Sequence, residues 1–263
     1  MIGAILGDVA GSIYEFDNTD KLPAKETLWT DDNCATDDSQ MTLALAKALC
    51  EIKNPNELYE AAIRNYREVG LRFPDAGWGQ MFDAWIVSDT PMPYGSWGNG
   101  AAMRVSPVAY YAKSEMECRQ LARIATVVTH NAEEAMKWAE KAALACYYGL
   151  HCQDSRERIK GMLDEAELVS DVSTLRQKEF NLRCSSTVIT AINVFLLTSS
   201  FEEAVQVAIS LGGDSDTIAC VTGAIAAACY GVSKEMRETA RRYCVPDLFQ
   251  YVEKLQDGCV GQR

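Results

Sequence analysis

Apolar residues recur every three to four positions along most of this chain, which is the period of an amphipathic α-helix. Alternating strand patterns are nearly absent, and the best strand-like run, residues 126–128, falls within a helical period. The spacing predicts an all-α fold in one domain spanning residues 1–263. We expect helices over residues 1–16, 40–50, 54–69, 101–112, 114–128, 131–149, 186–197, 200–209 and 218–230, a short one ending near 87, one exposed helix within 153–179, and two more starting at 233 and after 246.

The most apolar helix is the one expected over residues 218–230, which carries no charge and no polar stripe. Such a helix is typically buried on all sides. Gly212 and Gly213 permit a sharp turn before it, which places Asp214 and Asp216 at its start. Two carboxylates this close at a buried helix start repel each other unless a cation lies between them. The alternative is that one Asp caps the helix and the other interacts with the helix dipole.

A second acidic entrance is the T-D-D-S sequence at residues 36–39, which comes just before another apolar helix. Asp38 or Ser39 alone would be an ordinary helix N-cap.

The N-terminal segment adds a further carboxylate. Gly3, Gly7 and Gly11 let a neighbouring helix approach closely, and the same helix is expected to deliver Glu15 at its end. The alternative for Glu15 is a solvated position.

Residues 91–100 form a loop rich in Pro, Gly and aromatic residues, directly before the helix expected over 101–112. Amide groups exposed by glycines ahead of a helix can bind an anion, although loops of this composition also occur without ligands. His130 lies at the junction of two helices. A histidine in such a position is more often a hydrogen-bonded structural residue than a catalytic one.

Composition narrows the cellular setting and the partners. The net charge of −12 argues against general binding to nucleic acid or an anionic membrane, which needs clustered Lys and Arg. No apolar run is long enough to span a bilayer and no signal peptide is evident, so we expect a cytoplasmic protein. The ten cysteines include no C-x-x-C pair, and several fall inside apolar helices, so we expect core residues rather than disulfides.

Together the two acidic entrances offer four carboxylates and two threonine hydroxyls, which is an oxygen-only ligand set. Oxygen ligands suit Mg²⁺ or Mn²⁺, whereas zinc favours Cys and His. Neither stretch has the alternating ligands, central glycine and terminal Glu of an EF-hand. The sequence therefore predicts a magnesium or manganese site.

Six motifs carry a resemblance to a known family. In chain order they are G-A-I-L-G-D-V-A-G-S-I-Y-E at 3–15, T-D-D-S at 36–39, G-S-W-G-N-G-A-A-M-R-V at 95–105, T-H-N-A at 129–132, S-F-E-E-A-V at 200–205 and L-G-G-D-S-D-T-I-A at 211–219. With them the chain resembles the ADP-ribosylglycohydrolases, which remove ADP-ribose from modified proteins and include the dinitrogenase reductase-activating glycohydrolases.

The resemblance implies a compact all-α domain with a binuclear metal centre at one end of its helices, holding two Mg²⁺ or Mn²⁺ ions. The implied metal ligands are Thr36, Asp37, Asp38, Asp214, Asp216 and Thr217. The implied ADP-ribose contacts are Gly95, Ser96, Trp97, Gly98 and Asn99, in a loop that holds the diphosphate and neighbouring sugar, together with His130. Glu15 matches a mobile glutamate with a role in catalysis or metal binding. Two departures are Trp97, where relatives carry another aromatic residue, and Ser215, where they often have Thr.

The expected reaction is hydrolysis of the glycosidic bond between ADP-ribose and an acceptor, such as an arginine or serine side chain of a modified protein. This bond breaks through an oxocarbenium-like state that needs a positioned water and oriented ribose hydroxyls. Bound metals can help with both, while Asp38 or Glu15 takes a proton, and both carboxylates stay candidates for the general base.

Three other classes share parts of this pattern. A prenyl or terpene synthase would need D-D-x-x-D, but Asp37 and Asp38 are followed by S-Q-M. A haloacid dehalogenase-type phosphatase would need a strand before Asp214, where the pattern predicts a helix. The third is an ADP-ribose-binding or immunity protein with the same fold and little turnover. The acceptor and the oligomeric state stay open at this stage.

Overall fold

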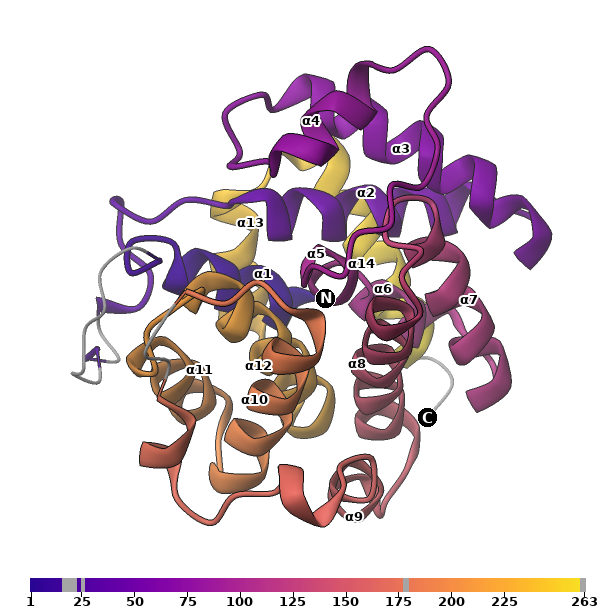
Figure 1. The fold of residues 1–263 in the computed structure, drawn as a ribbon. Coiled ribbons are helices and arrows are strands. Elements are labelled where there is room, and N and C mark those ends of the chain that lie inside the picture. The colour runs from indigo at the N-terminus through magenta and orange to yellow at the C-terminus, as the bar shows by residue number, and fades with distance from the viewer. Residues whose placement is uncertain (16–22, 25–26, 177–179, 261–263) are drawn as a thin grey trace.

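The computed structural model describes residues 1–15, 23–24, 27–176 and 180–260 (Figure 1). Within these ranges the α-helices are α1 (Ile2–Gly11), α2 (Asp37–Glu51), α3 (Leu58–Arg72), α4 (Gln80–Val87), α5 (Gly100–Met103), α6 (Ser106–Tyr111), α7 (Glu115–Val127), α8 (Glu133–His151), α9 (Ser155–Lys160), α10 (Cys184–Leu197), α11 (Phe201–Ser210), α12 (Ser215–Tyr230), α13 (Lys234–Tyr243) and α14 (Pro246–Val260). Short 3₁₀ helices are η2 (Pro55–Glu57), η3 (Glu165–Glu167) and η4 (Val172–Leu175). The only β pairing in the described part is one antiparallel bridge between Gly98 and Arg183, which confirms the predicted all-α class.

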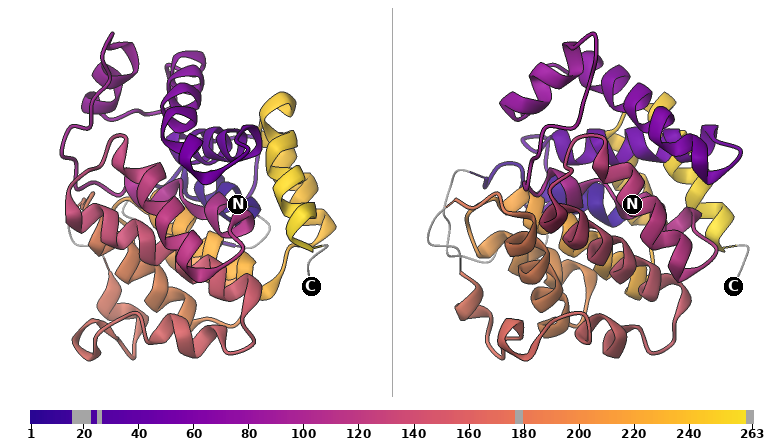
Figure 2. Two further views of the ribbon diagram at one scale, coloured as in Figure 1. Left: turned by 90° about the vertical axis from the view of Figure 1, so that its right-hand side faces the viewer. Right: turned by 45° about the vertical axis from the view of Figure 1, so that its right-hand side comes forward.

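Helix α12 is the centre of the fold and contacts α1, α8, α10 and α11 (Figure 1). Residues 218–228 are buried, as their uncharged sequence predicts, whereas Cys229 is partly buried and Tyr230 at the end of the helix is exposed. The turn before it is made by Gly212 and Gly213, whose φ angles of +72° and +71° lie in the left-handed region that favours glycine. Gly231 follows the helix at φ +93° and ends it. Figure 2 shows α13 and α14, in yellow, along one side of the molecule, where α13 contacts α1 and α14 contacts α2 and α6.

A glycine seam joins α1 to α12. A Cβ atom added at Gly7 would collide with the backbone of Ala219, and one added at Gly11 would collide with the backbone of Asp216. Gly3 meets α12 in the same way further along the helix. The seam confirms the predicted close approach, and it brings the end of α1 directly against the acidic start of α12.

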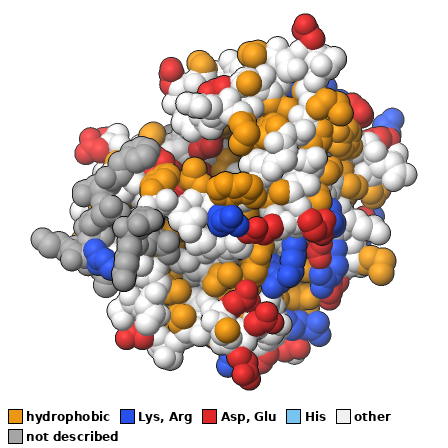
Figure 3. All heavy atoms as spheres, in the orientation of Figure 1, with side chains coloured by type: hydrophobic (Ala, Val, Ile, Leu, Met, Phe, Trp, Pro, Cys, Tyr) orange, Lys and Arg blue, Asp and Glu red, His pale blue; other side chains and the backbone are white. Residues whose placement is uncertain are grey.

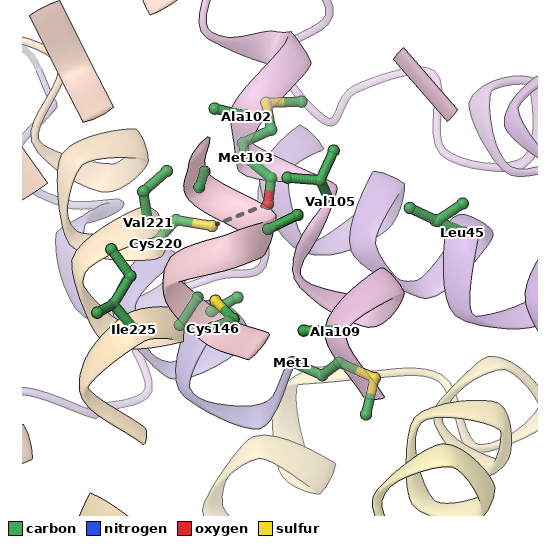
Figure 4. Close-up of a cluster of buried hydrophobic side chains, with 14 of the residues drawn as sticks. Met1, Leu45, Ala102, Met103, Val105, Ala109, Cys146, Cys220, Val221 and Ile225 are labelled. Atoms are coloured by element: carbon green, nitrogen blue, oxygen red, sulfur yellow. Dashed lines mark hydrogen bonds between the residues drawn. The ribbon is translucent and has the colours of Figure 1, made fainter. Parts of the chain in front are cut away.

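Part of the core lies where α12 meets α5 and α8 (Figure 4). There the thiol of Cys220 donates to the carbonyl of Met103 at 3.5 Å, and Cys146 lies in the same cluster. All ten cysteines are free thiols in this structure. Burial raises the pKa of the Cys146 thiol to about 12, as expected of a small core residue.

Two predicted helix limits near the site are wrong. The first helix ends at Gly11 rather than at 16, and the Ser12 hydroxyl then bonds to the carbonyl of Val9. Glu15 therefore lies in the turn after α1 rather than on the helix. The single helix predicted over 101–112 is two helices, α5 and α6, because Pro107 has no amide hydrogen to continue the helical bonding.

The limits predicted for α8 are also wrong. Asn131 does not cap this helix, because its side-chain oxygen instead accepts from the amide of Gly95 at 2.6 Å. The helix also continues past Gly149 to His151. Gly149 allows α8 to pass close to α12, since a Cβ there would press on Ala228 and Cys229.

Charged side chains of both signs are interspersed on the face shown in Figure 3. The ion pairs between described residues include Arg119 with Glu140, at 2.6 Å, and Arg183 with Glu134, at 3.0 Å. Among the described helices, none combines the length and the apolar character needed to cross a membrane.

Candidate metal and substrate site

Three chain segments bring carboxylates together at the start of α12. One oxygen each from Asp8, Asp38 and Asp216 lie within 4.8 Å of one another, and so do oxygens from Glu15, Asp214 and Asp216. Asp216 belongs to both groups and is the point where they meet. The segments are α1 with the turn after it, the first turn of α2, and the turn and first residues of α12.

Burial among like charges raises the pKa of each of these carboxyl groups. Burial is the largest cause and the Asp216 charge the second, and together they raise the pKa values of Asp8 and of Glu15 to about 7. The same two causes raise the pKa values of Asp38 and Asp214 well above the usual range. Such a cluster holds its charge only when positive charge is near.

The cluster fits a hard divalent cation. Its donor atoms are all oxygens, and Oδ1 of Asp38 is buried with no hydrogen-bond partner among the described residues. A buried carboxylate oxygen without a partner is costly unless a cation or water meets it. The hydroxyl of Thr217 donates to the other oxygen of Asp38 at 3.2 Å, which holds this carboxylate in place.

Asp8 is a site residue that the sequence analysis did not identify. One of its oxygens accepts from the amides of Thr36 and Ser39, both at 3.0 Å, and the other accepts from the Thr36 hydroxyl at 2.6 Å. Asp8 thereby caps α2 from another helix and orients the Thr36 oxygen. The available signal was a single carboxylate within an otherwise apolar helix, which requires a buried partner.

The remaining predicted metal residues lie at helix starts. Thr36 is the N-cap of α2, with Asp37 in the first turn, and Asp214 is the N-cap of α12. The side-chain amide of Asn99 donates to Asp214, so this predicted substrate residue is bonded to the acidic cluster. Asp37 lies outside both close groups, yet the charges of Asp216 and Asp8 reach it and, with burial, raise its pKa.

A cavity of about 470 Å³ opens beside this cluster, within the size range of small-molecule sites. One wall is acidic, and another wall is made by the loop before α5 together with His130 and Arg104. A third side is apolar and contributed by residues around α4 and by Phe180 and Leu182. The lining residues from the predicted site are Glu15, Asp37, Ser96, Gly98, Asn99, His130, Asp214, Asp216 and Thr217.

The loop before α5 is held by hydrogen bonds from distant segments. The amide of Gly95 donates to Asn131, and the amide of Asn99 donates to the carbonyl of Leu182 at 2.8 Å. The amide of Gly98 donates to the hydroxyl of Ser96 at 3.1 Å. These amides are therefore not free to form the anion cradle that the glycines indicated, and α5 is a single turn.

Trp97 lies between Ser96 and Gly98, which line the cavity, but does not itself line it. Its side chain is 49% exposed, and the guanidinium of Arg183 lies over the ring at 4.9 Å from the ring centre. Arg183 is in turn paired with Glu134. The amide of Cys184 donates to the Trp97 carbonyl at 3.1 Å, so the backbone here is fixed independently of the ring.

Known proteins resemble this chain in sequence and in fold. A family model described as ADP-ribosylglycohydrolase matches residues 1–262. ADP-ribosylhydrolase ARH3 of Bos taurus is 26% identical over 324 residues, covering 93% of this chain and 87% of the relative. ADP-ribosylarginine hydrolase Tri1 of Pseudomonas putida is 24% identical over 268 residues, covering 89% and 70% respectively. A solved structure titled "ADP-ribosylglycohydrolase-related protein complex" has a TM-score of 0.67 at 21% identity, over 98% of this chain and 97% of that one.

The all-α fold and the acidic cavity accompany a similarity to hydrolases over nearly the whole chain. The chain belongs to the ADP-ribosylglycohydrolase family. The family resemblance read from the six sequence motifs is therefore confirmed.

Proposed function

We propose that this protein hydrolyses the glycosidic bond between ADP-ribose and a protein side chain, and that it needs two divalent cations, Mg²⁺ or Mn²⁺, to do so. The observation that carries this proposal is the position of Asp216, which lines the cavity and belongs to both groups of carboxylates. Two adjacent oxygen sites that share one carboxylate are the arrangement of a binuclear centre.

Six residues would hold the cations, namely Thr36, Asp37, Asp38, Asp214, Asp216 and Thr217. When bound, the cations supply charge that orients ribose hydroxyls and makes a nearby water more acidic. Asp8 keeps the Thr36 oxygen oriented, and Thr217 steadies Asp38. Asn99 holds Asp214 through its side-chain amide.

Glu15 is the better of the two candidates for the general base. It lines the cavity and is only half-buried, so a water molecule beside the substrate can reach it. Asp38 is buried, does not line the cavity and is bonded to Thr217, which suits a ligand better than a proton acceptor. A base must lie within hydrogen-bond reach of the proton that it removes.

The substrate would be ADP-ribose attached to a protein. Ser96, Gly98, Asn99 and His130 form one side of the cavity and would contact the diphosphate and neighbouring sugar, with Gly95 and Trp97 beside them in the loop. The name of the Tri1 relative specifies an arginine acceptor, and the name of ARH3 specifies no acceptor. Arginine-linked and serine-linked substrates are therefore the two to compare.

The test is release of ADP-ribose from arginine-linked and serine-linked peptides in EDTA, Mg²⁺ or Mn²⁺, together with thermal unfolding in ADP-ribose. We expect release from at least one peptide with a cation and none in EDTA. We also expect a cation-dependent rise in melting temperature, since a ligand that binds only the folded state stabilises it. Stabilisation without release from either peptide would favour the ADP-ribose-binding alternative, and cation-independent release would refute the metal assignment.

A further inference from the structure

One ring nitrogen of His130 has two polar neighbours inside the protein. Nη2 of Arg104 lies 3.2 Å from Nδ1, and the hydroxyl oxygen of Thr129 lies 2.7 Å from the same atom. A guanidinium has no acceptor and can only donate. Nδ1 must therefore be the unprotonated nitrogen of the ring, because a donor cannot bond to another N–H. In a neutral imidazole the proton is then on Nε2.

Nε2 points to the glycine loop of the cavity wall. A Cβ atom added at Gly100 would lie 3.1 Å from Nε2, and one added at Gly98 would lie 3.7 Å from it. Gly98, Gly100 and His130 all line the cavity. No hydrogen bond among the described residues uses Nε2, although the side chain is only 5% exposed. A buried N–H without a protein partner in a cavity wall requires an acceptor from the ligand or from water.

Arg104 is fixed where it can hold this ring. Its side chain is 1% exposed, and its guanidinium lies over the Tyr66 ring at 5.0 Å and near the Phe82 ring at 5.8 Å from the ring centres. Nε donates to the carbonyl of Gly100. Within the described residues no carboxylate is paired with this guanidinium, so its charge acts on the cavity wall. Tyr94 packs on the other side of the imidazole, with ring centres 5.8 Å apart.

We propose that Arg104 is a positioning residue that fixes His130 as the neutral Nε2–H tautomer. The imidazole thereby donates a hydrogen bond to a phosphate or ribose oxygen of the substrate and cannot act as the general base. The inference rests on the proposed function for the identity of that substrate. Burial, and secondarily the Arg104 charge, lower the pKa of His130 well below its usual value, in agreement with a neutral ring.

The tautomer can be measured without any ligand. The chain has only two histidines, so ¹⁵N-histidine NMR of wild type and of His151→Gln assigns both rings. We expect the His130 signals to show a bare Nδ1 and a protonated Nε2, with no titration from pH 6 to 8. An Nδ1–H tautomer, or an ordinary titration near 6.5, would overturn the proposal.

Two variants separate the roles of the neighbours. Thr129→Val leaves Arg104 as the only donor to Nδ1, so the Nε2–H signal should persist. Arg104→Met removes that donor, so an Nδ1–H population should appear and ADP-ribose should bind about tenfold more weakly, the loss of one hydrogen bond. A folded Arg104→Met protein with the wild-type tautomer would refute the positioning role. If that variant does not fold, loss of the Nε2–H signal in Thr129→Val would refute it instead.

The donor role has its own pair of variants. Gln carries an N–H near the place of Nε2, so His130→Gln should bind ADP-ribose within about threefold of wild type, whereas His130→Ala should bind about tenfold more weakly. Unchanged affinity in His130→Ala would overturn the donor role. Binding of ADP shows which oxygen accepts the bond. If His130→Ala loses as much affinity for ADP as for ADP-ribose, the acceptor is on the diphosphate. If it loses affinity for ADP-ribose alone, the acceptor is on the terminal ribose. Failure of the wild-type protein to bind ADP-ribose would instead count against the proposed function. The tautomer of His130 would still be testable, because its NMR measurement needs no ligand.

Discussion

Two walls of the cavity, the acidic wall and the loop wall, carry charges of opposite sign. The acidic wall buries carboxylates such as Asp38, Asp214 and Asp216 together, where burial and the Asp216 charge raise the pKa values of the other two. The other wall buries a cation, Arg104, against aromatic rings and a histidine. Each wall concentrates charge of one sign on the same cavity, where a low dielectric strengthens it.

The difference shows which wall needs a cation from solution. Arg104 is held by aromatic faces and a backbone carbonyl, and its Nη1 has no partner among the described residues, so the loop wall offers hydrogen-bond donors and needs no added cation. The acidic wall leaves Oδ1 of Asp38 buried without a partner among the described residues. The acidic wall should therefore depend strongly on added cations and pH, whereas the loop wall should depend on neither.

The largest effect is expected from Asp216→Asn, which removes the carboxylate shared by both groups. Hydrolysis should fall by about 10³-fold or more, equal to roughly 4 kcal/mol of activation free energy. In EDTA the same variant should melt a few degrees higher than wild type, because one buried like charge is gone. The measurements are turnover and thermal unfolding with and without Mg²⁺. Full turnover would refute the metal assignment, and a lower melting temperature in EDTA would show that repulsion is not the dominant strain.

Removing the cations should make stability fall with rising pH. The folded pKa values of Asp8 and Glu15, about 7, lie above those of unfolded chains, about 4. Their contribution to the stability of the metal-free protein is complete below about pH 4 and is lost as pH rises through about 7. The melting temperature in EDTA should therefore fall between pH 5.5 and 8.

Saturating Mg²⁺ should offset that loss, because cations bind deprotonated ligands. The rise in melting temperature on adding Mg²⁺ should be larger at pH 8 than at pH 5.5, and about 2.7 kcal/mol of stabilisation is expected at 100 times the dissociation constant. Asp216→Asn is the control and should show little rise at either pH. An Mg²⁺-dependent rise of equal size at both pH values would contradict the coupling of cation binding to these carboxyl groups.

A smaller effect is expected from Glu15→Ala, since this residue lies after α1 and outside its packed seam. The variant should fold with a melting temperature close to that of wild type and hydrolyse about 10²-fold more slowly, the lower range for loss of a general base. The matched control is Glu60→Ala, at an exposed carboxylate on α3. Turnover equal to that control would return Glu15 to a solvated role without catalytic function.

The acidic wall was largely predictable because its residues are neighbours in the sequence. T-D-D-S and G-D-S-D-T each put their carboxylates at the start of an apolar helix, and such an entrance is visible without knowledge of the fold. Asp8 was not identified because its partners, Thr36 and Ser39, lie 28 and 31 residues further along the sequence. They meet Asp8 only when α1 packs beside α2.

The loop wall was less predictable because distant residues determine it. The glycines of the loop were evident, but the bonds to Asn131 and Leu182 that occupy their amides were not. Asn131 also matches a local capping pattern with Glu134, and the tertiary bond to Gly95 overrides it. Local sequence patterns thus identified the loop and His130, but they identified neither Arg104 as a residue of this wall nor the groups that are free to bind.

Trp97→Ala should give the smallest effect, and it acts on binding alone. We expect ADP-ribose to bind about tenfold more weakly with kcat nearly unchanged, because stacking on a base contributes about 1–3 kcal/mol and the ring lies away from the carboxylates. The loop should keep its shape, since its bonds to Leu182 and Cys184 use backbone atoms. Trp97→Phe, which keeps an aromatic face, should recover most of the affinity. A loss of kcat without a change in affinity would mean that the ring positions the acidic wall instead. The acidic wall and the loop wall would then not be independent.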